Sequence, residues 1–294
     1  MMKNLRQLIS ALLLASLLCA IASAQTAKPA TAGLPTEATA DAFLKQMFGW
    51  DQNLTWKIVE IKPAEAPGFA DVTAVFNTPQ GQQLFRIFVT PDQKYAFYGE
   101  MIPFGSDPFG GARELLKGVN GPSHGPVDGG ITIVEFGDLE CPACKAAQEP
   151  LSKLMSEEPR ARLIYQNFPL QSVHKWALLG AKYLTCTGQQ SNDTAFKFIS
   201  TVYTHQGEIS PETADAALKG YAKEAGANPD TLSACIAKPE TEAKIRESIK
   251  LGEKLGVTST PTFFINVRKI VGLGGNTRYE DVKAMVDYYM AQAK

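Results

Sequence analysis

This sequence has few histidines, few long apolar runs and no excess of positive or negative charge. Each of these features excludes a class of protein. The 294 residues hold 29 Lys and Arg against 30 Asp and Glu, so no basic excess points to nucleic acid or an anionic membrane surface. There are three histidines, and beyond one Cys-x-x-Cys pair there is no second such pair and no His-x-x-x-His to complete a zinc site. We therefore expect neither nucleic-acid binding nor a zinc site.

The apolar run near the N-terminus is shorter than a membrane span. Two basic residues precede an apolar stretch over residues 8–21, whereas a helix needs roughly 20 residues to cross the hydrocarbon core. A small-residue sequence ending at Ala24 follows, and this order is typical of a cleaved signal peptide. We predict a signal peptide over residues 1–24, a periplasmic or other extracytoplasmic location, and a flexible tether over residues 25–34.

Cysteine is also scarce, with five in the chain. Cys19 lies in the predicted signal peptide, and the remaining four are an even number, as complete pairing in an exported chain requires. Sequence order pairs Cys141 with Cys144, and Cys186 with Cys235. We expect the first pair to be redox-active and the second to be a structural disulfide.

Residues 35–117 are expected to form a small α+β domain. Apolar residues recur at helical spacing after Thr36, which can cap a helix that ends at Gly49. Four β-branched and aromatic runs follow, separated by turn-forming residues. These runs lie at residues 54–61, 72–76, 84–89 and 95–98. The pattern predicts one helix and an antiparallel meander, with no cysteine or histidine to suggest chemistry.

A Gly-Pro-rich stretch over residues 118–130 is typical of an interdomain linker. Strand candidates separated by helical segments then predict an α/β domain over residues 131–294. Helical periodicity over about residues 172–256 indicates a helical insertion between two strands. The predicted fold class is therefore α/β.

The reactive chemistry is predicted at the start of this domain. Cys141 and Cys144 follow the predicted strand at residues 131–136 and open a helix, whose N-terminus carries partial positive charge that stabilises a thiolate. Cys141 is expected to form a mixed disulfide with a substrate, and Cys144, one turn later, to resolve it. A lower thiol pKa makes the disulfide more oxidising.

Three motifs occur together in an order and spacing that resemble one family. The stretch VEFGDLECPAC at residues 134–144 is similar to the active-site segment of DsbA-like thiol:disulfide oxidoreductases. It is followed by NFPL at residues 167–170 with His174 after it, and by GVTSTPTFFIN at residues 256–266. The resemblance covers about residues 127–294.

The resemblance implies a thioredoxin fold with a helical insertion, preceded here by the small α+β domain. It implies a cis peptide bond at Pro261, facing the cysteine pair, and a role for Thr260 in offering backbone groups to an extended substrate. A subset of the family also carries a second disulfide in the region of Cys186 and Cys235. We assign His174 no catalytic role.

Asp138 and Glu140 flank the cysteine pair and are candidate modulators. Such carboxylates can raise a thiol pKa by like-charge repulsion, or assist proton transfer. The alternative is that both are solvated surface groups.

The leading functional hypothesis is a disulfide oxidase that donates the Cys141–Cys144 disulfide to reduced secreted proteins and is reoxidised by a membrane quinone-linked thiol oxidase. The extra domain favours an alternative, a disulfide isomerase or reductase acting on misoxidised proteins. A non-catalytic chaperone-like binding module and metal transport through the two cysteines are further alternatives. We expect no cofactor and no resident metal. The small domain is predicted to serve dimerisation into a homodimer or substrate binding.

Overall fold

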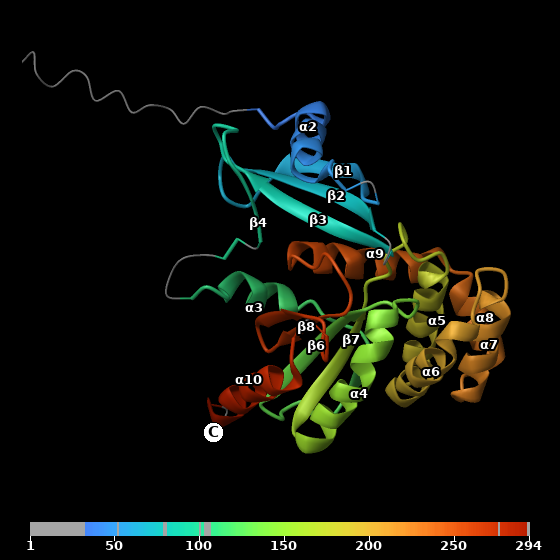
Figure 1. Ribbon diagram of the computed structural model, residues 1–294. Coiled ribbons are helices and arrows are strands. Elements are labelled where there is room, and N and C mark those ends of the chain that lie inside the picture. Colours follow the sequence, from blue (N-terminus) through green and yellow to red (C-terminus); the bar gives the residue numbers. More distant parts are fainter. Residues whose placement is uncertain are drawn as a thin grey trace, which may run out of the picture. The chain divides into compact units, whose positions relative to one another are not determined.

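The computed structural model describes residues 33–51, 53–78, 81–99, 101–102, 107–275 and 277–292. The predicted signal peptide and residues 25–32 of the predicted tether lie outside the described residues. The chain divides into two compact units, a small one ending at Gly99 and a larger one that runs to the end of the described residues (Figure 1). Within the described ranges, no helix is long and apolar enough to cross a membrane.

The small unit is a helix packed on an antiparallel sheet, as predicted. Helix α2 (Glu37–Phe48) begins where the Thr36 side chain accepts a hydrogen bond from the N–H of Thr39, and it ends at Gly49. The strands follow one another across the sheet in chain order. They are β1 (Thr55–Pro63), β2 (Ala70–Thr78), β3 (Gly81–Val89) and β4 (Ala96–Tyr98). Residues of α2 and the sheet share one apolar core: Ala40, Leu44, Ile58, Val72, Ala74, Phe76 and Ile87.

The larger unit contains a five-stranded sheet in the order β5-β7-β6-β8-β9. The strands are β5 (Ser123–His124), β6 (Ile131–Gly137), β7 (Ala161–Asn167), β8 (Thr262–Ile265) and β9 (Arg268–Val271). Strands β6 and β7 are parallel, whereas the other neighbouring pairs are antiparallel. The predicted α/β class is therefore confirmed.

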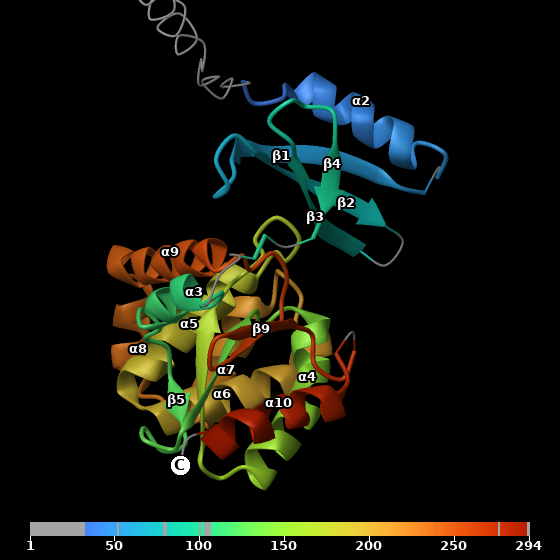
Figure 2. The same cartoon turned by 90° about the vertical axis from the view of Figure 1, so that its left-hand side faces the viewer.

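Helices cover both faces of this sheet (Figures 1 and 2). Helices α4 (Pro142–Glu157) and α10 (Tyr279–Gln292) pack on one face, and α3 (Gly110–Leu116) and α9 (Pro239–Lys254) pack on the other. The helices of the insertion share a separate core that also includes the active-site cysteines. They are α5 (Ala177–Gln190), α6 (Asn192–His205), α7 (Ala214–Glu224) and α8 (Pro229–Ile236). The 3-10 helix η1 (Gln206–Glu208) follows α6 and has no buried residue.

The central strand β6 is buried on both faces and places one acidic residue inside. Side chains alternate along a strand, so Ile133 faces the α4 side while Val134 and Phe136 face the α9 side. By the same alternation Glu135 falls on the α4 side, and its side chain is 1% exposed. The fold thus buries a carboxyl group beneath the helix that begins with the cysteine pair.

The start of the larger unit differs from the predicted boundaries at residues 117 and 118–130. Helix α3, which the sequence analysis did not predict, lies within the residues assigned to the small domain but packs against the core around Phe136 and Phe264. The expected linker contains β5, which pairs with β7. Its glycines do not mark a free connection: a Cβ at Gly121 would lie 1.8 Å from the carbonyl oxygen of Tyr165, so this position requires a bare backbone.

Candidate active site

The predicted redox pair lies where the central strand meets helix α4. Strand β6 ends at Gly137, a short loop follows, and Cys141 is the N-cap residue of α4, with Pro142 at the first helical position. Proline suits that position because its missing N–H would have no partner within the helix. The sulfur of Cys141 therefore lies at the positive end of the helix, and Cys144 lies one turn along on the inner side.

The thiol of Cys141 contacts the segment that precedes β8. Its sulfur lies 3.3 Å from the carbonyl oxygen of Thr260, and the Thr260–Pro261 peptide bond is cis. The hydrogen bond from Cys144 lowers the pKa of Cys141 to about 6, and burial opposes this shift. Cys141 therefore carries a thiolate at neutral pH.

Cys144 has the opposite environment. Its side chain is fully buried, and burial raises the pKa of its thiol well above the usual value; hydrogen bonding to Cys141 raises it further. The backbone N–H of Asp138 points at the Cys144 sulfur at 3.5 Å. The two thiols of this pair are free, and they differ in acidity in the way that an attacking and a resolving cysteine require.

The sequence reasoning missed a third ionisable group at this site, the buried carboxyl group of Glu135. Burial raises the pKa of Glu135 to about 8. The side-chain amide of Gln148 approaches Glu135 Oε1 at 3.4 Å and donates to the carbonyl oxygen of Cys144 at 3.1 Å, which connects the two residues. An acidic residue inside the apolar run of the predicted strand was the signal that could have revealed it.

Asp138 and Glu140 are not solvated surface groups, which was one of the two alternatives that the sequence allowed. Asp138 is 2% exposed, and its carboxylate accepts hydrogen bonds from the backbone N–H groups of Glu140 at 2.9 Å and Leu170 at 2.8 Å. Glu140 accepts a hydrogen bond from the N–H of Trp176 at 2.6 Å, and burial raises its pKa. Both carboxyl groups hold neighbouring segments against the active-site loop.

His174 is the second partner of Asp138. Its Nδ1 lies 2.8 Å from Asp138 Oδ2. Burial lowers the pKa of His174, but the hydrogen bond and charge of Asp138 outweigh it, and the net pKa is raised. The structure thus brings His174 to the active-site loop through Asp138.

Thr260 contributes a backbone and a side-chain feature. Its carbonyl oxygen faces Cys141, while its own hydroxyl is buried and has no hydrogen-bond partner among the described residues. A buried hydroxyl without a partner has lost its solvation, so its environment favours an incoming polar group.

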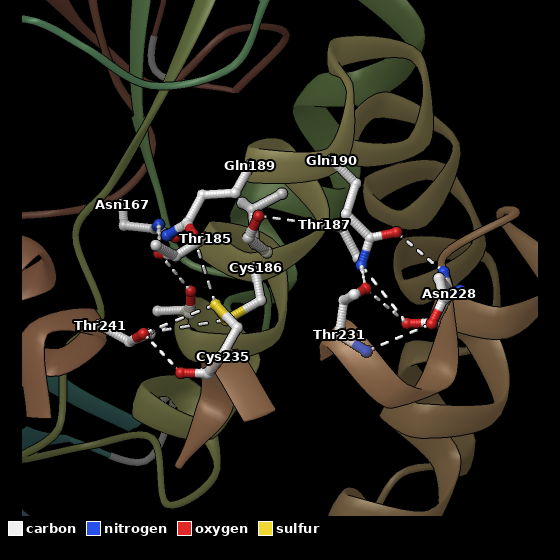
Figure 3. The surroundings of a disulfide bond; sticks show 12 residues. Asn167, Thr185, Cys186, Thr187, Gln189, Gln190, Asn228, Thr231, Cys235 and Thr241 are labelled. Carbon is white, nitrogen blue, oxygen red and sulfur yellow. Dashed lines mark hydrogen bonds between the residues drawn. A yellow bond between two sulfur atoms is a disulfide. The ribbon is translucent and has the colours of Figure 1, made fainter. Parts of the chain in front are cut away.

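The second cysteine pair forms a disulfide, Cys186–Cys235, that links α5 to α8 (Figure 3). The two Cα atoms are 5.8 Å apart. Thr241 donates a hydrogen bond to the carbonyl oxygen of Cys235 at 2.7 Å. The structure therefore separates a free cysteine pair at a helix start from a bonded pair inside the insertion. Across the described ranges there is no group of three or more His, Cys, Asp or Glu side chains that could hold a metal ion.

The fold and site define the class as a thioredoxin-fold protein with an asymmetric cysteine pair at a helix N-terminus. A family model described as Thioredoxin matches residues 119–288, which is more than half of the chain. The chain belongs to this thioredoxin family.

Relatives in sequence and structure agree with this assignment. The chain is 26% identical over 172 residues to the probable disulfide bond formation protein D of Bacillus anthracis, covering 56% of this chain and 76% of that protein. A thioredoxin-like oxidoreductase from Silicibacter pomeroyi DSS-3 superposes with a TM-score of 0.50 at 25% identity, over 65% of this chain and 99% of that one. The predicted resemblance to DsbA-like thiol:disulfide oxidoreductases is therefore confirmed.

Another relative in sequence is an antiporter. The chain is 30% identical over 146 residues to the Na(+)/H(+) antiporter NhaA 1 of Salinispora arenicola. That match covers 50% of this chain but 22% of the antiporter, so the chain spans about a fifth of that relative's length.

Proposed function

We propose that the chain is an exported thiol:disulfide oxidoreductase that introduces disulfides into secreted proteins through the pair Cys141-Pro142-Ala143-Cys144. The observation that carries the proposal is the difference between the two thiols. The pKa of Cys141 is lowered to about 6, whereas burial raises that of Cys144 well above the usual value. A stabilised Cys141 thiolate favours the reduced pair, so the disulfide form is oxidising.

The reaction begins from the Cys141–Cys144 disulfide. A substrate thiolate attacks the sulfur of Cys141, a substrate–Cys141 disulfide forms, and the Cys141–Cys144 bond breaks with its electron pair on Cys144. A second substrate thiolate then attacks the substrate sulfur of the mixed disulfide and releases Cys141 as a thiolate. The substrate loses two electrons and the cysteine pair gains them.

Cys144 must take up a proton after the first step, because its buried site disfavours the thiolate. Glu135 lies beneath α4 and its pKa is raised to about 8, so its carboxyl group is protonated at neutral pH. We assign Glu135 the delivery of this proton, which returns from solvent before the next cycle.

Thr260 and Pro261 supply the substrate-binding surface in this proposal. The Thr260 carbonyl oxygen lies beside the Cys141 sulfur, so an extended segment of substrate next to its own cysteine meets this backbone first. The buried Thr260 hydroxyl offers a further polar contact.

Export completes the proposal. The N-terminal sequence pattern and the second disulfide, Cys186–Cys235, both suit an oxidising compartment such as the periplasm. The partners are reduced secreted proteins as substrates and a membrane quinone-linked thiol oxidase as the reoxidant. Mass spectrometry of the protein purified from its host tests this part: a mature chain beginning at Gln25 supports export through a cleaved signal peptide, and a retained N-terminus refutes it.

The decisive experiment measures the equilibrium of the Cys141–Cys144 pair with glutathione and the refolding of one reduced and one scrambled substrate. An oxidising potential with activity on the reduced substrate alone supports the oxidase. Activity on the scrambled substrate supports the alternative, a disulfide isomerase. The absence of exchange in both assays refutes an oxidoreductase and leaves a chaperone-like binding module.

The additional small domain is the feature that favours an isomerase. It exposes several aromatic side chains, with Trp50 at 79%, Tyr95 at 69% and Tyr98 at 80% exposure. We propose that this domain forms a homodimer or binds substrate. Light scattering across a concentration series separates the two, because only a homodimer doubles the mass without substrate.

A further inference from the structure

One turn of the helical insertion contacts the backbone of the active-site loop directly. At the end of α6, the hydroxyl of Tyr203 donates to the carbonyl oxygen of Asp138 at 3.3 Å. Three residues later, the side-chain amide of Gln206 donates to the carbonyl oxygens of Leu139 at 2.8 Å and Cys141 at 3.1 Å. The insertion thus binds three of the four carbonyl groups between residues 138 and 141.

The contact of Gln206 with Cys141 is made at the first turn of α4. The same carbonyl oxygen accepts the helical hydrogen bond from the N–H of Lys145 at 3.2 Å, so both of its lone pairs are used. Lys145 in turn places its amino group 3.5 Å from the carbonyl oxygen of Thr204. The end of α6 and the start of α4 therefore fix each other through reciprocal polar contacts.

We propose that Gln206 is a positioning residue of the redox site, whose amide fixes the Leu139 and Cys141 carbonyl groups and thereby stabilises the Cys141 thiolate. This inference rests on the proposed function, since it concerns the reactivity of the same cysteine. In this proposal the helical insertion helps to set the acidity of the Cys141 thiol.

The physical reason is the partial negative charge of a carbonyl oxygen. The carbonyl oxygens of Leu139 and Cys141 carry partial negative charge, which disfavours a thiolate at Cys141. An amide N–H of Gln206 directed at each oxygen reduces this unfavourable interaction. Gln206 is uncharged, so its contribution is present at every pH. The titratable groups of the same region have partners other than Gln206: Glu135 contacts Gln148, Asp138 contacts His174, Glu140 accepts from the Trp176 N–H, Cys144 contacts Cys141, and Lys145 contacts the Thr204 carbonyl oxygen.

The variant Gln206→Met removes both donors and keeps the length of the side chain. We expect the acid dissociation constant of Cys141 to fall roughly three- to tenfold, as the loss of about one net hydrogen bond implies. The thiolate absorbance of the reduced full chain, followed against pH, measures this value. The equilibrium with glutathione should move toward the disulfide by a similar factor.

Gln190→Met is the matched control, because Gln190 makes the same kind of contact within the insertion. Its amide donates to Asn228 O at 3.4 Å and Thr231 Oγ1 at 3.1 Å, and its carbonyl oxygen accepts from the Asn228 N–H at 2.8 Å (Figure 3). This variant should lower the unfolding midpoint and leave the acidity of Cys141 unchanged. An equal loss of acidity in both variants would show a general structural effect and overturn the inference.

A second variant, Gln206→Glu, keeps the shape of the side chain and replaces the donors with a carboxylate. It should weaken the acidity of Cys141 more than Gln206→Met does, so an unfolded Met variant still leaves a test. Unchanged acidity in a folded Gln206 variant, while the unsubstituted protein exchanges disulfides, refutes this inference alone. Absence of both thiolate and exchange in the unsubstituted protein refutes the proposed function instead.

Discussion

The larger unit contains two cysteine pairs that differ in bonding state and in their position in the fold. Cys141 and Cys144 are free, lie at the start of one helix, and have pKa values shifted in opposite directions. Cys186 and Cys235 are bonded and join two helices across 49 residues of sequence. Carbonyl, amide and carboxyl groups lie around Cys141 and Cys144. Cys186 and Cys235 lie among the helices of the insertion.

The comparison teaches that the partners around a cysteine, more than its compartment, decide whether it reacts. An oxidising space favours both disulfides equally. A helix N-terminus and nearby donors stabilise a thiolate at Cys141 alone, and that stabilisation opposes permanent oxidation of its pair. The predictions below separate the two pairs by the property each one controls.

The largest expected effect is on disulfide exchange. Cys141→Ser should lower the rate of substrate oxidation at least about a thousandfold, because the attacked sulfur is gone. Replacing Cys186 and Cys235 together by Ser should change that rate by less than about threefold. Both variants are compared in the refolding assay with reduced substrate. Comparable losses of substrate oxidation in the two variants would show that the two cysteine pairs do not differ in function.

The reverse contrast is expected for stability. Removing the Cys186–Cys235 disulfide frees a long loop in the unfolded chain and should lower the free energy of unfolding by about 4 kcal/mol. Urea unfolding of the double Ser variant, compared with the unsubstituted protein, measures the loss. The acidity of Cys141 serves as the control, and it should stay constant. A change of less than about 1 kcal/mol would contradict a structural role.

Glu135 sharpens the comparison because it lies beside the first pair alone. Burial raises its pKa from 4.5 to about 8, so the folded state binds its proton more tightly than the unfolded state. Its favourable contribution is complete below pH 4.5 and is lost as pH rises through about 8, about 5 kcal/mol in total. Glu135→Gln should abolish this part of the pH dependence in unfolding curves between pH 5 and 9. An identical pH profile in the variant would argue against a buried neutral carboxyl group.

His174 provides the smallest effect. Its raised pKa means that its stabilising charge is present below pH 6.5 and is lost as pH rises through the higher folded value. His174→Gln retains a hydrogen bond to Asp138 but no charge, and it should cost about 0.5–1 kcal/mol at pH 6 and little at pH 9. Thermal unfolding at both pH values measures the difference. A loss of equal size at both would assign His174 a packing role only.

Much of the fold could be predicted because the local signals are strong. Thr36 and Gly49 bound the first helix as capping residues do, and alternating β-branched runs marked the meander. The structure divides the chain at Gly99, whereas the sequence placed a boundary near residue 117, and the difference has a physical reason. The glycines of residues 118–130 indicate an interdomain linker, but Gly121 and Gly125 are required because the backbone around β5 lies directly against β7.

The sequence allowed a prediction of the reactive cysteines, but not of the residues that surround and position them. Spacing and the family motifs predict Cys141 and Cys144 as the redox pair, and the structure places both at the start of α4. Glu135 was not predicted as a site residue, because a single acidic residue in an apolar run does not indicate whether its side chain lies in the core or in solvent. Gln206 carries no signal at all, since it lies 65 residues from Cys141 and meets it only through folding.

The sequence by itself determined the class of fold and the positions of the cysteine pair proposed for redox chemistry, because capping, periodicity and motif spacing are local properties of the chain. The tertiary structure alone decided which thiol is acidic, which carboxyl group is neutral and which distant amide reaches the active-site loop. Those outcomes depend on burial and on contacts between residues far apart in the chain, and neither is encoded within a short stretch of sequence.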